Sequence, residues 1–331
     1  MNSNLKRTFL RILQFTACFS TGAVVKSQFT TSKAFTFSMA NFPSCHRLIQ
    51  IHGEDDRKND IIFCGDIRNA VSHIIFFGGD VQDYPENMLA HRDNKHHIKW
   101  SLEATAKLLY QKHPNSAIWV IKPANMYIKT FSSFSNFVDC SEIGVPSPEP
   151  TDHGAFRHLQ KLFLMGVLQA YTIPAEETHA TCPSDNASSE PHPAATTLPI
   201  SVVGFSKGCV VLNQLLFELQ AAKADPELGK FVSQVQSMYW LDGGHNGGSK
   251  TWVTDRTILS SLVGTNIEVH VHVTPYQIND PMRKWIGKEE KKFVEELEKL
   301  GVKVKETVHF KDEPRSIENH FRVLEEFGGR T

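Results

Sequence analysis

The chain has 331 residues, of which 40% are hydrophobic and 21% are charged, and its formal net charge is −1. This composition is that of a globular protein with a sizeable core, and the balanced charge argues against a basic face for nucleic acid. No apolar run reaches the roughly 18 residues that predict a transmembrane helix. The six cysteines are widely spaced, which favours reduced thiols in an intracellular compartment over a disulfide framework.

The first forty residues differ from the rest of the chain, because they contain Lys and Arg but no Asp or Glu. Leu5, Phe9 and Ile12 can share one face of a helix. This pattern predicts a mitochondrial transit peptide, or a disordered segment, over residues 1–40. A secretory signal peptide is the alternative, but its apolar core would have to include Arg11.

Beyond residue 45, apolar runs predict an opening hairpin and then strands that alternate with helices. The predicted strands cover residues 46–52, 61–64, 73–77, 117–121, 201–205, 235–241, 267–273 and 302–310. The predicted helices cover residues 94–113, 155–171, 209–222, 284–300 and 317–327. This order predicts one α/β domain over residues 45–330, built on a doubly wound, mostly parallel sheet. A low-complexity insert over residues 174–199 has too few large apolar side chains to fold by itself.

Between the strand 201–205 and the helix 209–222 lies Gly204-Phe205-Ser206-Lys207-Gly208, which fits the G-x-S-x-G pattern. In α/β-hydrolases such a serine sits on a strained strand-to-helix turn, and small flanking residues avoid collisions with the neighbouring elements. The pattern alone is weak, but the flanking strand and helix are those it requires. The sequence therefore predicts an α/β-hydrolase fold with Ser206 as the nucleophile.

A serine nucleophile needs a histidine base and an acid that orients it, and in this fold they follow the serine in the order acid, then histidine. We favour Asp280 and His320, which both follow strands of the C-terminal third. Asp280 lies in a loop that prolines constrain. Asp242 is the alternative acid; it lies among four glycines, which we expect to make it mobile. Three further histidines are rival bases: His245, His272 and His309.

The oxyanion of the reaction needs two backbone N–H donors. One is expected from Lys207, the residue after the nucleophile. The other is expected from the loop after the strand 73–77, where Gly78 and Gly79 permit a close approach of the backbone. The alternative is a tight turn that merely requires glycine.

Three segments carry a resemblance to a known family: FFGGDVQDYPENM, GFSKGCVVLNQLLFEL and WLDGGHNGG. The chain resembles the uncharacterised mitochondrial α/β-hydrolase-like family of the human chromosome 2 open reading frame 69 protein, from about residue 45 to the end. The resemblance implies a location in the mitochondrial matrix and a role in maintaining respiratory function. It implies no known substrate. Lys207 differs from the residues usual after the nucleophile of esterases, which puts ordinary esterase activity in doubt.

Two functions therefore remain open at this point. The first is a serine hydrolase that cleaves an ester, thioester or amide of a small-molecule or acyl substrate. The second is a non-catalytic protein that keeps the hydrolase fold and binds a mitochondrial protein partner. No cofactor is expected, because Gly78-Gly79 lacks the rest of a dinucleotide fingerprint. No metal is expected either, because His270 and His272 lack a third ligand in register.

Overall fold

The computed structural model describes residues 44–174 and 193–328. Every described residue belongs to one compact unit, Pro43–Thr331. The predicted leader, residues 1–40, and most of the predicted insert lie outside the described residues.

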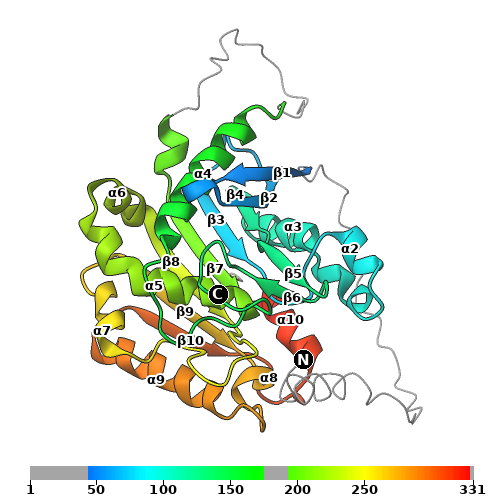
Figure 1. The fold of residues 1–331 in the computed structure, drawn as a ribbon, viewed down its shortest axis with the longest axis vertical. Helices are drawn as coiled ribbons and strands as arrows, with labels where there is room; N and C mark the ends of the chain where they lie inside the picture. The colour runs from blue at the N-terminus through cyan, green and yellow to red at the C-terminus, as the bar shows by residue number, and fades with distance from the viewer. Residues whose placement is uncertain (1–43, 175–192, 329–331) are drawn as a thin grey trace, which may run out of the picture. The chain divides into compact units, whose positions relative to one another are not determined.

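The described residues form one large sheet, which Figure 1 shows in ribbon form. Its strands are β1 (Cys45–His52), β2 (Lys58–Cys64), β3 (Ser72–Phe77), β4 (Ser116–Ile121), β7 (Ile200–Phe205), β8 (Val235–Leu241), β9 (Glu268–Val273) and β10 (Val304–Val308). They lie in the order β1-β2-β4-β3-β7-β8-β9-β10. Strand β2 is antiparallel to both of its neighbours, and every other pair in this sheet is parallel. The predicted opening hairpin and mostly parallel sheet are confirmed.

Helices lie on both faces of this sheet (Figure 1). The α-helices are α2 (Pro85–Leu89), α3 (Leu102–Lys112), α4 (Ala155–Tyr171), α5 (Cys209–Ala224), α6 (Pro226–Gln234), α7 (Arg256–Leu259), α8 (Pro275–Ile278), α9 (Trp285–Lys299) and α10 (Ile317–Glu326). One core packs α4, α5, α6 and α9 against one face. A second core packs α3 and α10 against the other face. The parallel strands are thus covered on both faces, and for this reason their sequences are continuous apolar runs.

One predicted helix differs from the structure, and one further hairpin lies where the sequence predicted no helix or strand. The helix predicted over residues 94–113 is a 3₁₀ segment, Asn94–Trp100, followed by α3, because Ser101 caps the new helix by accepting from the Ala104 amide. The aromatic segment after β4 forms a small hairpin, β5 (Asn125–Tyr127) with β6 (Phe131–Ser133). Two of its phenylalanines are buried against β3, with the Phe77 ring 5.6 Å from Phe134 and 5.1 Å from Phe137. They pack over the sheet.

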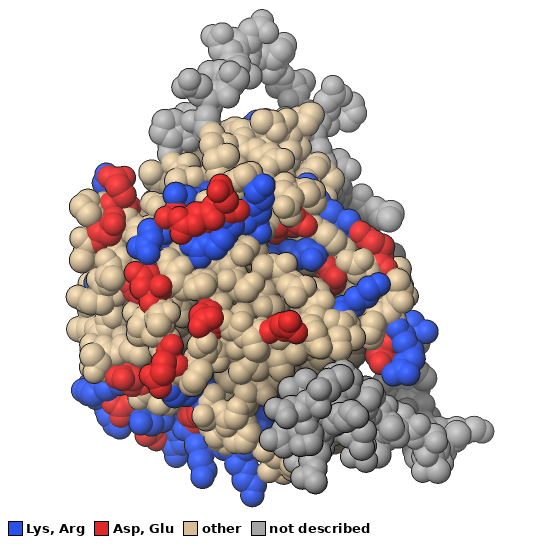
Figure 2. Space-filling model, in the orientation of Figure 1, with Lys and Arg blue, Asp and Glu red and all other residues tan. Residues whose placement is uncertain are grey.

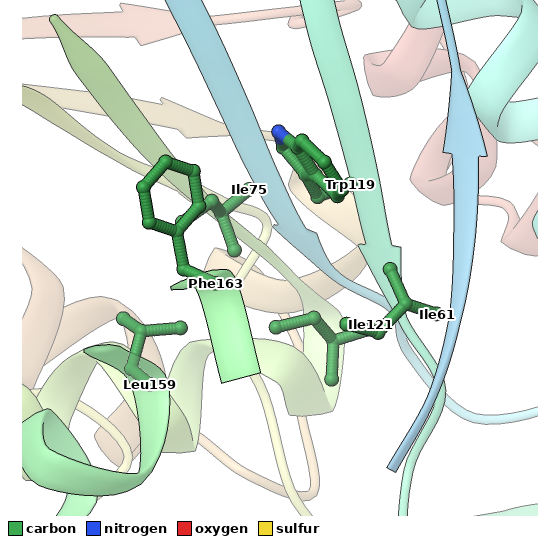
Figure 3. Close-up of a pocket in the computed structure, with 6 residues that line it drawn as sticks. All are labelled: Ile61, Ile75, Trp119, Ile121, Leu159 and Phe163. Carbon is green, nitrogen blue, oxygen red and sulfur yellow. The ribbon is translucent and has the colours of Figure 1, made fainter. Parts of the chain in front are cut away.

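Figure 3 shows a small cavity between α4 and the sheet. Its lining is apolar and consists of Ile61, Ile75, Trp119, Ile121, Leu159 and Phe163. Each of these side chains belongs to the core on that face. The cavity is a packing defect and brings no chemically reactive group together.

The surface carries charges of both signs. On the face in Figure 2, Lys and Arg side chains are interspersed with Asp and Glu. Within the two described stretches, no helix is long and apolar enough to cross a membrane.

Candidate active site

The G-x-S-x-G segment forms a tight turn between β7 and α5. Ser206 has a φ of 53°, in the left-handed region that serine rarely adopts. Both flanking glycines are sterically required: a Cβ on Gly208 would lie 2.1 Å from the carbonyl oxygen of Phe77, and one on Gly204 would lie 2.9 Å from Cα of Cys209. The local geometry is therefore that of a nucleophile elbow.

Two further residues beside this turn have a positive φ. Val81 follows β3 with a φ of 75°, and Asp242 follows β8 with a φ of 46°. These two strands are the neighbours of β7 in the sheet. A positive φ costs energy in any residue with a side chain, most of all in β-branched valine. Such strain is typical of functional sites, and here it marks the carboxyl edge of three adjacent strands.

His320, on α10, is held by Asp242. Its Nδ1 lies 2.6 Å from Asp242 Oδ2, and both residues are buried. The Asp242 carboxylate also accepts from the backbone N–H and the hydroxyl of Thr274, each at 2.7 Å. Three donors thus fix the carboxylate. The His320 ring packs against Phe205, the residue before Ser206, with ring centroids 4.7 Å apart.

The acid predicted first, Asp280, does not orient His320. Its carboxylate accepts from Arg283 Nε at 2.8 Å, from Arg315 Nη2 at 2.9 Å and from the Met282 amide at 2.8 Å. These bonds occupy both oxygens, and the two guanidinium groups hold the pKa of Asp280 below its usual value against the opposing effect of burial. The structure pairs His320 with Asp242, which the sequence offered as the alternative.

The rival histidines are engaged elsewhere. His245 Nδ1 accepts from the Gly247 amide, and its Nε2 donates to the carbonyl of Lys250. His272 Nδ1 and His309 Nε2 lie 2.8 Å apart and bond to each other. Among the described residues, no hydrogen bond joins the ring of any of the three to the Asp242 carboxylate, which His320 binds.

The loop after β3 lies against the elbow, as expected for an oxyanion loop. A Cβ on Gly79 would lie 2.7 Å from Cβ of Ser206, and one on Gly208 would lie 2.8 Å from the carbonyl oxygen of Gly78. The Gly79 amide, however, already donates to Gln82 Oε1 at 2.9 Å. Gln82 is fully buried, and its own amide donates to Trp100 and Thr105. Gln82 thus fixes the loop, a role that the sequence pattern did not indicate.

Lys207 is almost fully buried and joins three parts of the site. Its Nζ lies 2.8 Å from Asp80 Oδ1 in the loop after β3 and donates to the carbonyl of Ile143 at 2.7 Å. Asp80 also accepts from the amide and hydroxyl of Ser132, on β6. Lys207 therefore anchors the segment that runs from β6 to Ile143 beside the elbow.

No group of three or more His, Cys, Asp or Glu side chains that could hold a metal ion occurs within residues 44–174 and 193–328. The reactive groups of the site are also well shielded from solvent. The exposed fraction is 8% for Ser206, 4% for His320 and 0% for Asp242. Charges in so dry a site interact more strongly than they would in water.

The strand order, the strained serine elbow and the Asp–His pair at the same sheet edge define an α/β-hydrolase fold. Comparison with known sequences is more specific, because the C2orf69 family model matches residues 47–188 and 169–303. The chain belongs to this family.

Two relatives illustrate the extent of the similarity. The mitochondrial protein C2orf69 homolog of Danio rerio is 40% identical over 327 residues, which cover 94% of this chain and 94% of the relative. The mitochondrial protein C2orf69 of Homo sapiens is 44% identical over 285 residues, which cover 77% of this chain and 74% of the relative.

Solved structures that are similar to this chain are more distant. A dienelactone hydrolase from Anabaena variabilis is 14% identical, with a TM-score of 0.42, over 87% of this chain and 96% of that one. An acylaminoacyl peptidase from Pyrococcus horikoshii is 10% identical, with a TM-score of 0.46, over 87% of this chain and 40% of that one.

Proposed function

We propose that this protein is a mitochondrial serine hydrolase that cleaves an ester, thioester or amide. The observation that carries the proposal is the short bond between His320 Nδ1 and Asp242 beside a strained serine elbow. An aspartate that holds Nδ1–H leaves Nε2 as the acceptor for the proton of the nucleophile.

The proposed reaction has two steps. Ser206 Oγ attacks the substrate carbonyl while its proton passes to His320 Nε2, and the protonated imidazole then delivers that proton to the leaving group as the bond to it breaks. Water hydrolyses the resulting acyl-serine by the same proton route. The Lys207 amide is the proposed first oxyanion donor. We propose the second from the loop that Gly78 and Gly79 begin, although the Gly79 hydrogen itself is bonded to Gln82.

Labelling with a fluorophosphonate probe tests whether Ser206 is activated. The wild-type protein should be labelled, and Ser206→Ala should abolish the labelling because it removes the attacking oxygen. Ser201→Ala is a matched control on β7, the strand that leads into the elbow, since Ser201 bonds to Ser237 and lies outside the elbow. Labelling of the Ser206→Ala variant at the wild-type rate would refute the assignment of Ser206 as the nucleophile.

The second candidate function is a non-catalytic protein that binds a mitochondrial partner. The low exposure of Ser206 and the anchoring of the neighbouring segment by Lys207 favour it. A folded wild-type protein that no fluorophosphonate labels, and that turns over no ester, thioester or amide, would select this candidate.

The names of the relatives support a mitochondrial location, and the acid-free leader supports import. We propose that residues 1–40 direct this chain to the matrix. A tagged protein lacking them should remain in the cytosol with its melting temperature nearly unchanged, because the described helices and strands begin at Cys45. Import of the shortened protein would refute the transit peptide.

A role in maintaining respiration is part of the same proposal. Cells without the protein should consume less oxygen, and the wild-type chain should restore consumption. If the Ser206→Ala variant also restores oxygen consumption, the respiratory role does not require hydrolysis.

A further inference from the structure

The Asp280 cluster is the strongest charged feature beside the site that the hydrolase chemistry does not use. We define it as Asp280, Arg283 and Arg315. Both guanidinium groups donate to the same oxygen, Asp280 Oδ2. Two positive charges share one negative charge, so the cluster carries a net charge of +1.

Asp280 acts here as a scaffold for the arginines. Its side chain is 5% exposed, whereas those of Arg283 and Arg315 are 24% and 25% exposed. Arg315 Nε also donates to the Tyr276 carbonyl at 2.8 Å. A guanidinium held in this way loses little conformational entropy when it binds an anion.

Donor atoms remain on the solvent side of the cluster. Within the described part of the chain, Arg283 donates to a protein acceptor only through Nε. Its two Nη atoms form the planar fork that binds a carboxylate by two parallel hydrogen bonds.

The Tyr276 ring contacts both the cluster and His320. The Arg315 guanidinium carbon is 4.8 Å from the centre of the Tyr276 ring, which is itself 4.8 Å from the His320 ring. Burial, with the charges of Lys207 and Arg283, lowers the pKa of His245.

We propose that the Asp280 cluster binds a carboxylate on the non-reacting part of the substrate, through the Nη atoms of Arg283. The proposal rests on the proposed function and names its substrate class: carboxylate-bearing esters or thioesters. Two exposed apolar side chains, Met282 and Ile317, neighbour the arginines in sequence and suit an aliphatic chain attached to that carboxylate.

Matched substrates test this with the purified protein. One pair is the hexanoyl and adipoyl thioesters of N-acetylcysteamine, which differ by a carboxylate on the acyl chain. The other is the hexanoyl esters of phenol and 4-hydroxybenzoate, which differ by a carboxylate on the leaving group. The wild type should have a higher kcat/KM for the acidic member of one pair. A preference within the thioester pair places the carboxylate on the acyl chain, and a preference within the phenyl ester pair places it on the leaving group.

Arg283→Gln should lower this acidic-to-neutral ratio by about tenfold to a hundredfold, because a charged hydrogen-bond pair is lost. Arg283→Lys keeps the charge but not the fork and should lower it less. Arg322→Gln should leave the ratio unchanged, since Arg322 pairs with Glu313 and does not bond to Asp280. A wild type with no acidic preference in either pair overturns the proposal and leaves the hydrolase function standing.

If the protein hydrolyses none of these compounds, a binding measurement still decides the carboxylate site. Monomethyl adipate should bind in calorimetric titration more tightly than dimethyl adipate, and Arg283→Gln should weaken its binding by at least about tenfold. Equal binding of the two adipates, or equal binding by wild type and variant, would overturn the proposal.

Discussion

At the residue scale, the clearest difference from expectation is the acid. The sequence predicts that Asp242 is mobile among its glycines, yet the two glycines that follow it directly are packed tightly. A Cβ on Gly244 would lie 2.3 Å from Gln277 Nε2, and one on Gly243 would lie 3.3 Å from Trp252. Glycine is needed there so that the loop can approach its neighbours, and the packed loop holds Asp242 still.

Two of the three proposed catalytic residues could be predicted from the sequence, and the acid could not. Ser206 and His320 follow from local pattern and chain order, because the elbow and the acid-then-histidine order are features of sequence. The choice between Asp242 and Asp280 depends on which carboxylate Arg283 and Arg315 neutralise. That depends on long-range packing, which no local pattern records.

Substitution of the two acids should separate their roles. Asp242→Asn removes the carboxylate that holds His320 Nδ1–H, so fluorophosphonate labelling of Ser206 should slow by about 10⁴, as loss of the acid does in a serine protease. Asp280→Asn should slow labelling of Ser206 far less, since its carboxylate serves two arginines. Labelling rates of both variants, with circular dichroism to verify folding, test this assignment. The reverse order of rates would return the role to Asp280.

At the scale of elements, sequence patterns located the strands and the longest helices well. The shorter elements needed other signals. Helix α6 begins with Asp225 as an N-cap, whose carboxylate accepts from the Glu227 and Leu228 amides, and Pro226 occupies the first helical position. This start signal was readable in the sequence. The β5–β6 hairpin has no such signal, because Asp80 and Lys207 fix it from distant parts of the chain.

The Lys207–Asp80 ion pair gives a prediction about these elements. Lys207→Met leaves Asp80 without its cation, and we expect the free energy of unfolding to fall by about 2 kcal/mol. Breaking a fully buried pair costs about 3–5 kcal/mol, and Asp80 is partly exposed. Limited proteolysis should cut more readily between β6 and Ile143, because the segment loses its anchor.

The double variant Lys207→Met with Asp80→Asn is the control for this ion pair. It removes the unpaired charge of Asp80, so its free energy of unfolding, measured by urea denaturation, should be higher than that of Lys207→Met alone. Losses that simply add would mean that the two side chains do not interact.

At the scale of the whole molecule, buried neutral histidines couple the fold to pH. His73, on β3, is fully buried; its Nδ1 accepts from Trp119 Nε1, and its Nε2 donates to the carbonyl of Ala195. A second ring proton would point at the indole N–H. Burial lowers the pKa of His73 to about 4, and burial likewise lowers the pKa of His158 and of His272 to about 3.

Protonation of these histidines at low pH favours the unfolded chain. An unfolded histidine has a pKa near 6.5, so between pH 6.5 and pH 4 the unfolded chain binds more protons than the folded one. The free energy of unfolding should therefore fall as the pH drops through this range, and His73 alone accounts for roughly 3 kcal/mol of the loss. His73→Gln keeps an acceptor and a donor but cannot be protonated. Urea denaturation between pH 7 and pH 4.5 should give this variant a shallower dependence of stability on pH than the wild type. Equal slopes for the two proteins would mean that His73 is already protonated in the folded state or that its environment stabilises the charge.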